Sequence, residues 1–471
     1  MSSKKYYVTT PIYYVNDAPH IGSSYTTLAA DIIARYYRDK LGKNNVFFLT
    51  GTDEHGQKIA EVAKKNNQTP LEFVDSIVPK FKEAWKLLNI DFDYFIRTTD
   101  PRHEKVASAL LQKLYDKGYI YLGAYEGPYC IGCERYYKES ELLNNRCPLH
   151  PDKEISHQRE KNYFFKLKEV VEDYVLPKIK NKEYKILPEI RENEILSRVE
   201  EGVDDISISR EGVTWGIPLP WDKTQTCYVW VEALMNYYSA TLFLEGRQHF
   251  WPADLHLMAK DILWFHAVIW EALLIAADID LPKTVFAHGF FTINGQKMSK
   301  SLGNVITPQE LVNKYGIDGA RYLLISAVAF GTDGDISLES FDQKYNADLA
   351  NGLGNLVSRV AKMAEKSEFQ FSSKDTKIYD EVHSAISEYR FDTALKFIWD
   401  KITLVDQAIN KDEPWKLEGQ KLKERLQYYL EEIAEIALNL KPFLPQTVEK
   451  IDKVFASPVI RMQEPLFPRL K

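Results

Sequence analysis

Near its start the chain reads KYYVTT at residues 5–10, SYTTLAADIIARYYRDKL at residues 24–41 and VFFLT at residues 46–50. The first stretch is predicted as a β-strand, and the second has the spacing of a helix. The third is short, apolar and followed by Gly51, which is typical of a fully buried strand. A strand, a helix and a strand in this order predict a mostly parallel sheet with helices on both faces.

The same alternation continues along the chain and is interrupted once. Thr69-Pro70-Leu71-Glu72 is a capping box with proline at the first helical position, and it predicts a helix to about residue 88. Glycine, tyrosine and cysteine dominate after residue 117, and strand-like sequence returns at residues 228–231. We therefore predict an inserted domain, after which strands at 254–259 and 284–288 flank a helix at 261–276.

The last third of the sequence has a different character, with apolar residues at helical spacing. One run comprises Phe391, Leu395, Ile398, Ile402, Val405 and Ile409, and a later run comprises Tyr429, Ile433, Ile436 and Leu440. We predict an α/β fold in which a Rossmann-type parallel-sheet domain is split by an insertion and followed by a helix bundle. The expected limits are 1–117 and 226–325 for the two halves of the sheet domain, 118–225 for the insertion, 326–347 for a linker and 348–471 for the bundle.

Composition narrows the class of protein. The 471 residues are 45% hydrophobic and 27% charged, which is the balance of a globular protein. The N-terminus enters strand-like sequence at once, which leaves no room for a signal peptide, and we expect a cytoplasmic protein. The formal net charge is −7, so any contact with nucleic acid has to come from local basic patches.

The first chemical motif is Pro19-His20-Ile21-Gly22-Ser23, between the first strand and its helix. Gly22 lets the backbone come close to a phosphate or an adenine, and the start of a helix offers free N–H groups to an anion. His20 can donate to a phosphate oxygen. A histidine and a glycine at this spacing also occur in ordinary turns, so the motif by itself is weak.

The second motif is Lys297-Met298-Ser299-Lys300-Ser301-Leu302-Gly303-Asn304. Lys297 and Lys300, in a glycine-flanked loop, can place two ammonium groups on a polyphosphate and neutralise a pyrophosphate leaving group. A solvated lysine-serine loop is the alternative interpretation. The two motifs together resemble the double signature of the class I aminoacyl-tRNA synthetases.

The third motif is Cys130-x2-Cys133-x13-Cys147-x2-His150, which contains three of the four cysteines. Two closely spaced pairs of soft ligands separated by a loop predict a tetrahedral zinc site. With four protein ligands there is no open position, so the expected role of Zn²⁺ is structural. His157 is a rival ligand with less favourable spacing, and Cys227 is expected to be a buried strand residue.

Further blocks narrow the resemblance to the methionyl-tRNA synthetase family, and the similarity extends over the whole chain. These blocks are Tyr13-Tyr14-Val15-Asn16, Gly51-Thr52-Asp53-Glu54-His55-Gly56, Tyr228-Val229-Trp230-Val231-Glu232-Ala233-Leu234, Lys260-Asp261-Ile262 and Phe265-His266. The resemblance implies that Asp53 holds the α-ammonium of methionine. It also implies a side-chain pocket formed by Ile12, Tyr14, Trp230, Ala233, Tyr237, Ile262, Phe265 and His266. Aromatic faces suit a polarisable thioether, and a tyrosine hydroxyl can donate weakly to sulfur. Each of these aromatic residues, taken singly, also fits an ordinary core position.

The helical third resembles the anticodon-reading helices of the same family. Asn355 and Arg359 are one helical turn apart, so both can reach the same partner. Trp415 can stack on an unstacked base. Packing within a loop is the alternative role for Trp415, and a solvated face is the better interpretation of the lysines at 161–185.

The resemblance implies the formation of methionyl-adenylate from L-methionine and ATP, with Mg²⁺, followed by transfer to the 3′-terminal adenosine of tRNA(Met), initiator and elongator. His20, Lys297 and Lys300 are the implied catalytic residues, and Gly22 and Ser23 join them at the nucleotide. We expect a monomer, because the sequence holds no C-terminal dimerising extension.

Ser23 departs from the family signature, which has a second histidine at this position. The departure leaves open a non-catalytic tRNA-binding paralogue. A class I synthetase for cysteine or a branched aliphatic amino acid is a further alternative, although the branched-chain enzymes carry a long editing insertion for which this chain has no room.

Overall fold

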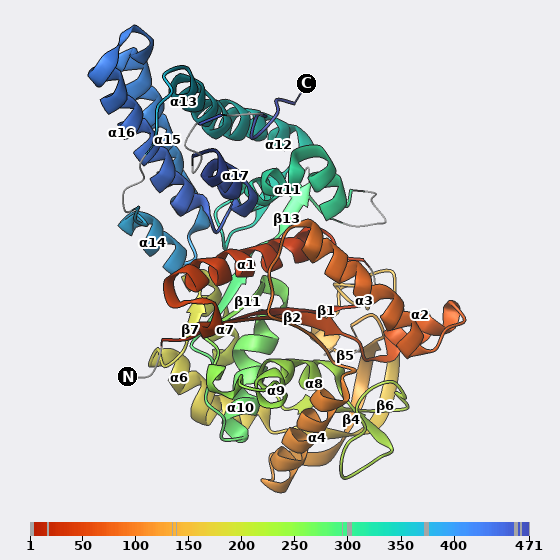
Figure 1. Ribbon diagram of the computed structural model, residues 1–471. Helices are drawn as coiled ribbons and strands as arrows, with labels where there is room; N and C mark the ends of the chain where they lie inside the picture. Colours follow the sequence, from red (N-terminus) through yellow and green to blue (C-terminus); the bar gives the residue numbers. More distant parts are fainter. Residues whose placement is uncertain are drawn as a thin grey trace. The chain divides into compact units, whose positions relative to one another are not determined.

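The computed structural model describes residues 4–16, 18–133, 135–137, 139–293, 295–298, 304–371, 376–455, 460–461 and 464–470 (Figure 1). The chain forms two compact units. We call residues 1–18, 43–83 and 92–287 the sheet unit, and residues 19–42, 84–91 and 288–471 the helical unit. Across the residues listed above, no helix is long and apolar enough to cross a membrane. The predicted domain limits stay predictions.

The sheet unit is built on a six-stranded sheet in the order β3-β2-β1-β11-β12-β7. Its strands are β1 (Tyr6–Tyr14), β2 (Val46–Asp53), β3 (Tyr94–Arg97), β7 (Lys185–Leu187), β11 (Leu255–Ala259) and β12 (Thr284–His288). β1 pairs in parallel with both β2 and β11, β2 with β3, and β12 with β7. The predicted α/β fold with a parallel sheet is therefore confirmed. β1 and β2 run further than predicted, to Tyr14 and Asp53.

Helices pack against this sheet through a shared apolar core. Tyr7 of β1 stacks on Phe47 of β2 with ring centroids 4.8 Å apart, and both side chains are fully buried. The same core includes Leu111 of α4, Ala240 of α9 and Leu273 of α10. Helices of the sheet unit are α2 (Gln57–Lys65), α4 (Pro101–Asp116), α5 (Leu167–Val170), α6 (Leu176–Lys180), α7 (Glu189–Glu200), α8 (Val229–Leu234), α9 (Asn236–Phe243) and α10 (Glu271–Ala276).

The predicted capping box is present at the start of α3 (Pro70–Leu87). The backbone N–H of Thr69 donates to Glu72 Oε2 at 2.8 Å, and the N–H of Glu72 donates to Thr69 Oγ1 at 3.3 Å. These reciprocal bonds use two of the donors that a helix start leaves unpaired.

Between β3 and β11 most of the strands pair antiparallel, and β7 is the exception. A four-stranded sheet has the order β5-β4-β6-β8, where β4 (Ile120–Cys130) pairs with β6 (Ile155–Phe165) along its whole length. The two short strands are β5 (Arg135–Tyr136) and β8 (Ile206–Ser207). Another antiparallel pair joins β9 (Ser209–Glu211) to β10 (Gln225–Cys227). The long β4–β6 ladder carries Cys130 at its far end.

The predicted strand at residues 228–231 is wrong. The strand β10 ends at Cys227, and Tyr228 is the N-cap of α8, which begins at Val229. Val229 and Val231 are both buried in the core. A short apolar run is equally consistent with a buried helix and a buried strand, and periodicity alone does not separate them. Tertiary packing decides the structure here.

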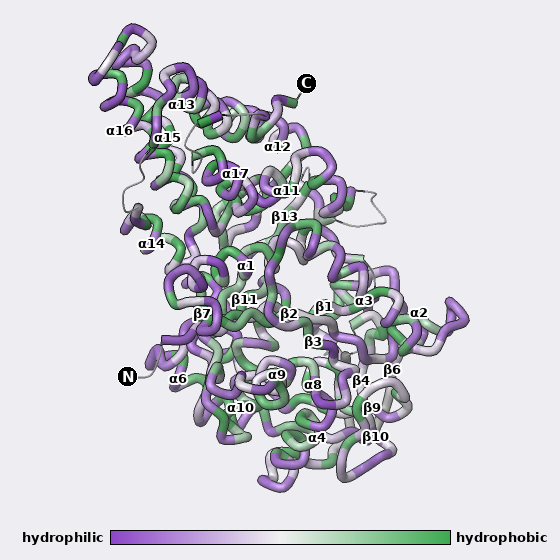
Figure 2. Tube along the Cα trace, in the orientation of Figure 1, coloured by the Kyte–Doolittle hydropathy of each residue, from purple (hydrophilic) through white to green (hydrophobic). Residues whose placement is uncertain are grey.

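The helical unit contains the two amphipathic runs predicted from the sequence. The first lies on α15 (Phe391–Asp412) and the second on α16 (Gly419–Leu440), and every apolar residue of both runs is buried. Figure 2 shows hydrophobic and hydrophilic residues alternating along these helices, which lie side by side with α13 (Figure 1). The other helices are α1 (Ile21–Leu41), α11 (Pro308–Ser326), α12 (Leu338–Lys344), α13 (Asn355–Lys366), α14 (Asp380–Ser387) and α17 (Pro445–Phe455). The helical C-terminal part is confirmed.

A buried arginine ties α1 to α11 and to the end of α16. Arg321 has no solvent exposure, and its guanidinium lies 2.8 Å from the equally buried Asp31. It also donates to the carbonyl oxygens of Leu88, Pro442 and Phe443, each at 2.9 Å. A buried charge is tolerated only where it is paired and hydrogen-bonded, and this one is both.

We expect Arg321→Ala to lower the free energy of unfolding of the helical unit by about 3–5 kcal/mol, because Asp31 would remain as a buried charge without its main partner. Arg35→Ala is the matched control. Arg35 also contacts Asp31, at 2.8 Å, but its side chain is 19% exposed, so its loss should cost about 1 kcal/mol or less. Denaturant unfolding measures both, and equal losses would contradict a special role for Arg321.

Candidate functional site

Some of the residues that the resemblance assigns to the methionine site lie at the carboxyl ends of the central strands of the sheet unit. Ile12 and Tyr14 lie at the end of β1, and Tyr14 is directly opposite Asp53 in the β1–β2 register. On its other side β1 pairs with β11. The strand order changes direction here, because β1 is followed by β2 on one side and by a much later strand on the other. In open parallel sheets such a switch point is where ligands bind.

Short helical segments supply the rest of the set. Trp230 and Ala233 are on α8, and Tyr237 is in the first turn of α9. After β11 the chain enters a 3₁₀ turn (Lys260–Ile262) and a π-helical segment (Phe265–Trp270). π-Helical turns are rare and occur mostly at functional sites. Ile262, Phe265 and His266 come from these two segments.

Ring contacts bring α8, α9 and the π-helical segment together. Trp230 stacks on Phe265 with centroids 4.2 Å apart and an interplanar angle of 15°. The hydroxyl of Tyr237 lies 2.7 Å from Nε2 of His266. These residues form one aromatic group in the sheet unit instead of being scattered through its core.

The hydroxyl of Tyr237 donates its proton to Nε2 of His266. His266 Nδ1 lies 2.9 Å from the carbonyl oxygen of Ile262, which can only accept, so Nδ1 carries the ring proton. Burial lowers the pKa of His266 to about 4, so the ring is neutral and Nε2 accepts from Tyr237. The expectation of a tyrosine proton for a thioether therefore does not fit Tyr237, whose oxygen offers a lone pair instead.

Asp53 supplies a carboxylate near this group: burial raises the pKa of the Tyr237 hydroxyl, and the charge of Asp53 raises it further. Asp53 is 6% exposed and is the last residue of β2. The buried His55 lies two residues further along. Burial alone would lower the pKa of His55, but the carboxylates of Glu232, Glu104 and Asp53 together raise it to about 10. A carboxylate near a group of aromatic side chains is suited to a ligand with an ammonium group and an apolar tail.

The sequence did not predict a buried polar group that includes His55. The fully buried Glu232 lies between His55 and His103, which come from separate parts of the sheet unit. Glu232 and His55 lie within the quoted blocks, and a glutamate in an otherwise apolar run was the signal available. Nothing local in the sequence points to His103.

The Pro19–Ser23 motif forms the start of α1 in the helical unit. His20 is the exposed N-cap, and its Nδ1 accepts from the backbone N–H of Gly22 at 3.0 Å. A Cβ atom at Gly22 would lie 2.8 Å from the His20 ring, so glycine is required for this approach. Because Nδ1 is an acceptor, a neutral His20 ring carries its proton on Nε2.

Ser23 has a local role that explains how the motif tolerates it. Its hydroxyl accepts from the backbone N–H of His20 at 3.2 Å and donates to the His20 carbonyl oxygen at 2.8 Å. Together with the Gly22 bond this is a capping box, which stabilises the helix start that presents its N–H groups. Ser23 thus supports the backbone of His20.

The lysine motif is only partly described. Lys297 lies on β14 (Gln296–Lys297), whose partner is β13 (Phe291–Ile293), with Thr292 opposite Lys297. β13 also pairs in parallel with β15 (Gly334–Ile336). Lys300 lies outside the described residues.

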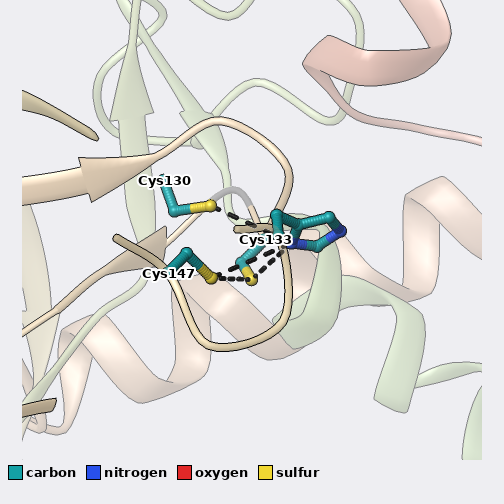
Figure 3. Close-up of side chains that lie close together, drawn as sticks. Cys130, Cys133 and Cys147 are labelled. Atoms are coloured by element: carbon teal, nitrogen blue, oxygen red, sulfur yellow. Dashed lines mark hydrogen bonds between the residues drawn. The ribbon is translucent and has the colours of Figure 1, made fainter. Parts of the chain in front are cut away.

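The cysteine motif closes into one cluster at the end of the β4–β6 ladder (Figure 3). Cys130, Cys133, Cys147 and His150 each point one ligand atom inward, and all four atoms lie within 4.8 Å of one another. The sulfur atoms of Cys133 and Cys147 are 3.5 Å apart, and His150 Nδ1 is 3.1 Å from Cys133 Sγ and 3.9 Å from Cys130 Sγ. A tetrahedral ion with metal–sulfur bonds of about 2.3 Å would separate two sulfurs by about 3.8 Å. The donor set therefore fits a metal ion.

A buried tyrosine and a glycine border this cluster. The buried Tyr137 places its hydroxyl 3.0 Å from Cys133 Sγ and 3.2 Å from Cys147 Sγ. A Cβ atom at Gly132 would lie 2.6 Å from the His150 ring, so only glycine lets this histidine approach. The rival ligand His157 is outside the cluster, with a side chain 66% exposed near Glu139. Cys227 is buried in the core of the sheet unit, at the end of β10.

The three predicted anticodon residues lie on α13 and just after α15. Asn355 is exposed, and Arg359 donates to Asp406 and, at 2.9 Å, to Asn410 near the end of α15. Trp415 follows that end in a 3₁₀ turn (Pro414–Lys416). Its side chain is 58% exposed, which is unusual for a tryptophan that serves packing.

Comparison with known proteins gives one consistent result. A family model described as tRNA synthetases class I (M) matches residues 6–155 and 137–361. Methionine–tRNA ligases of Caldanaerobacter subterraneus and Streptomyces coelicolor are each 41% identical, over 95% and 97% of this chain and 73% and 90% of their own lengths. The structure of Mycobacterium tuberculosis methionyl-tRNA synthetase in complex with methionyl-adenylate superimposes with a TM-score of 0.92 at 35% identity, covering 99% of this chain and all of that one.

The apo form of the same mycobacterial enzyme gives a TM-score of 0.86 at 32% identity. Matches at this identity and coverage go well beyond a shared fold. With the aromatic group, the nucleotide motif and the cysteine cluster all in one chain, they show that the chain belongs to the methionyl-tRNA synthetase family of class I aminoacyl-tRNA ligases.

Proposed function

We propose that this chain activates L-methionine with ATP to methionyl-adenylate and then transfers the methionyl group to the 3′-terminal adenosine of tRNA(Met). The observation that carries the proposal is the position of Asp53 at the switch point of the sheet, where its charge acts on Tyr237. Tyr237 is bound to His266, and Trp230 stacks on the neighbouring Phe265. Family membership supplies the reaction type. In the first step the methionine carboxylate attacks the α-phosphate and pyrophosphate leaves.

For the amino-acid half, Asp53 binds the α-ammonium group and the aromatic pocket holds the thioether. Ile12, Tyr14, Ala233 and Ile262 complete the pocket. A largely apolar pocket distinguishes ligands that differ by one methylene by only about 1–3 kcal/mol. The charged contact fixes the position of the carboxylate that attacks, so its contribution is to orientation as well as affinity.

For the nucleotide half, His20 donates from Nε2 to a phosphate, and Lys297 and Lys300 neutralise charge on the leaving pyrophosphate. Gly22 and Ser23 hold the backbone that presents His20. Mg²⁺ bound with ATP would neutralise part of the charge on the phosphates. The capping role of Ser23 argues against a non-catalytic paralogue, because the helix start keeps its geometry without a second histidine.

For the tRNA half, Asn355, Arg359 and Trp415 read the anticodons of initiator and elongator tRNA(Met). The exposed Trp415 offers a face on which an unstacked base can stack. Zn²⁺ is the ion proposed for the four-ligand cluster, where it supplies a structural crosslink. Four free cysteines suit a reducing compartment, so we propose a cytoplasmic protein, and a monomer stays our expectation.

Methionine-dependent exchange of pyrophosphate into ATP tests the proposal and its alternatives directly. We expect exchange with methionine and none with cysteine or isoleucine. Asp53→Ala should raise the KM for methionine by at least about 30-fold, which corresponds to about 2 kcal/mol for a lost buried charge contact. Asp278→Ala, which removes a carboxylate that is 68% exposed in the same unit, is the control. An unchanged KM in Asp53→Ala would show that Asp53 is not the ammonium ligand.

Elemental analysis of protein purified without added metal should find about one zinc per chain. Cys133→Ser should lose this zinc and lower the melting temperature. Cys227→Ser, which changes a buried cysteine outside the cluster, should keep it. Retention of zinc by Cys133→Ser would rule out the proposed ligand set.

Trp415→Ala should weaken aminoacylation of tRNA(Met) by about 1–3 kcal/mol in kcat/KM, the usual contribution of stacking on one base. The tRNA-independent exchange reaction should keep its original rate. Leu404→Ala removes an apolar side chain of α15 with nearly the same exposure, 56%, and should change neither assay. Parallel losses in both assays would make Trp415 a packing residue.

A further inference from the structure

A carboxylate with no contact to solvent lies behind the proposed amino-acid site. Glu232, on α8, is fully buried and is shared by two histidines of the sheet unit. Its Oε1 lies 2.8 Å from Nδ1 of His55, and its Oε2 lies 3.1 Å from Nε2 of His103. The other nitrogen of His103 lies 2.8 Å from the hydroxyl of Ser239 on α9. Both carboxylate oxygens therefore have a partner.

Glu232 and His55 are both charged at neutral pH. Burial disfavours the charged form of Glu232, but His55 and His103 outweigh this and hold its pKa below the usual value. His55 is protonated, with a pKa of about 10. Its second nitrogen faces Glu104, 3.6 Å away on α4. A buried carboxylate and imidazolium are kept ionised only by such close pairing.

Three members of this group lie within two residues of a proposed pocket residue, and the fourth, His103, joins them from α4. His55 is two residues beyond Asp53, and Glu232 lies between Trp230 and Ala233 on α8. Ser239 is two residues beyond Tyr237. A series of hydrogen bonds thus runs from Ser239 through His103 and Glu232 to His55. It links the segment after β2 to α8 and α9, three of the segments that border the proposed pocket.

The backbone around His55 is fixed from its other side as well. Trp215 donates from its indole nitrogen to the carbonyl oxygen of Glu54 at 2.6 Å, and its own carbonyl accepts from the N–H of Gly56 at 3.0 Å. Its ring also meets the His55 ring edge-on, with centroids 5.4 Å apart. With both flanking residues held, the Glu232 contact determines how His55 and the preceding residues lie against α8.

We propose that Glu232 is a positioning residue for methionine: it locks the segment carrying Asp53 against the helix carrying Trp230 and Ala233, and it balances the charge of His55. Without that carboxylate charge the buried His55 ring would be driven to lose its proton, so the ion pair that holds the two segments together would be lost. Glu232 touches no substrate. This inference rests on the proposed role of Asp53 as the ammonium ligand.

Glu232→Gln is the decisive variant, because the amide keeps the size of the side chain and an acceptor for His55 while the charge is removed. In the exchange assay we expect the KM for methionine to rise about tenfold, the KM for ATP to stay within twofold, and kcat to fall less than threefold. A residue that served only folding would change the active fraction, and hence kcat, without this split. In an Asp53→Ala background, Glu232→Gln should add less than a twofold further increase, because both variants act through one contact.

Glu104→Gln is the matched control. It makes the same chemical change in a carboxylate that faces the other nitrogen of His55 but is 41% exposed, and the KM for methionine should change less than twofold. Should Glu232→Gln fail to fold, His103→Gln tests the same link from the other oxygen, with an expected rise of threefold or more.

The outcomes separate this proposal from the one on which it rests. A KM for methionine within twofold of native in a folded Glu232→Gln or His103→Gln protein, while Asp53→Ala still raises it strongly, would overturn the positioning role alone. Additive effects of Glu232→Gln and Asp53→Ala would also overturn it. If Asp53→Ala leaves the KM for methionine unchanged, the assigned amino-acid site is wrong and this inference fails with it.

Discussion

The parallel pairing of β1 with β2 on one side and β11 on the other is the constraint on which the site depends. Parallel strands end at the same edge of a sheet, so the residues that follow them meet without any further device. Tyr14 ends β1 opposite Asp53 at the end of β2, and the turn after β11 leads into the segment with Phe265 and His266. One sheet edge thereby gathers residues more than two hundred positions apart.

Each unit also contains a buried charge pair that joins its elements. In the sheet unit Glu232 links His55 and His103, and in the helical unit Arg321 links Asp31 to three backbone carbonyls. Buried pairs of this kind add little net stability over well-packed apolar side chains. They do require one arrangement of the elements that carry them, because any slip leaves a charge without a partner.

Much of this structure could be predicted from local pattern. The short apolar stretches at residues 46–50 and 284–288 are strands, and the runs on α15 and α16 bury the expected faces. The cluster of Cys130, Cys133, Cys147 and His150 was predictable because each pair of these residues is close in the sequence. The strand predicted at residues 228–231 was wrong because an apolar run fits a buried helix as well as a strand. The tautomer of His266, the capping bond of Ser23 and the sharing of Glu232 depend on hydrogen bonds that no pattern of residue types specifies. The roles of the site residues stay predictions.

We propose that the carboxylate of Asp53 and the nearby aromatic group bind methionine together. A crystal structure of this chain with bound L-methionine tests it most directly. We predict the α-ammonium within hydrogen-bonding distance of Asp53, and the thioether between the Trp230–Phe265 pair and the Tyr237–His266 pair. Methionine bound elsewhere, or with its ammonium turned away from Asp53, would contradict the account.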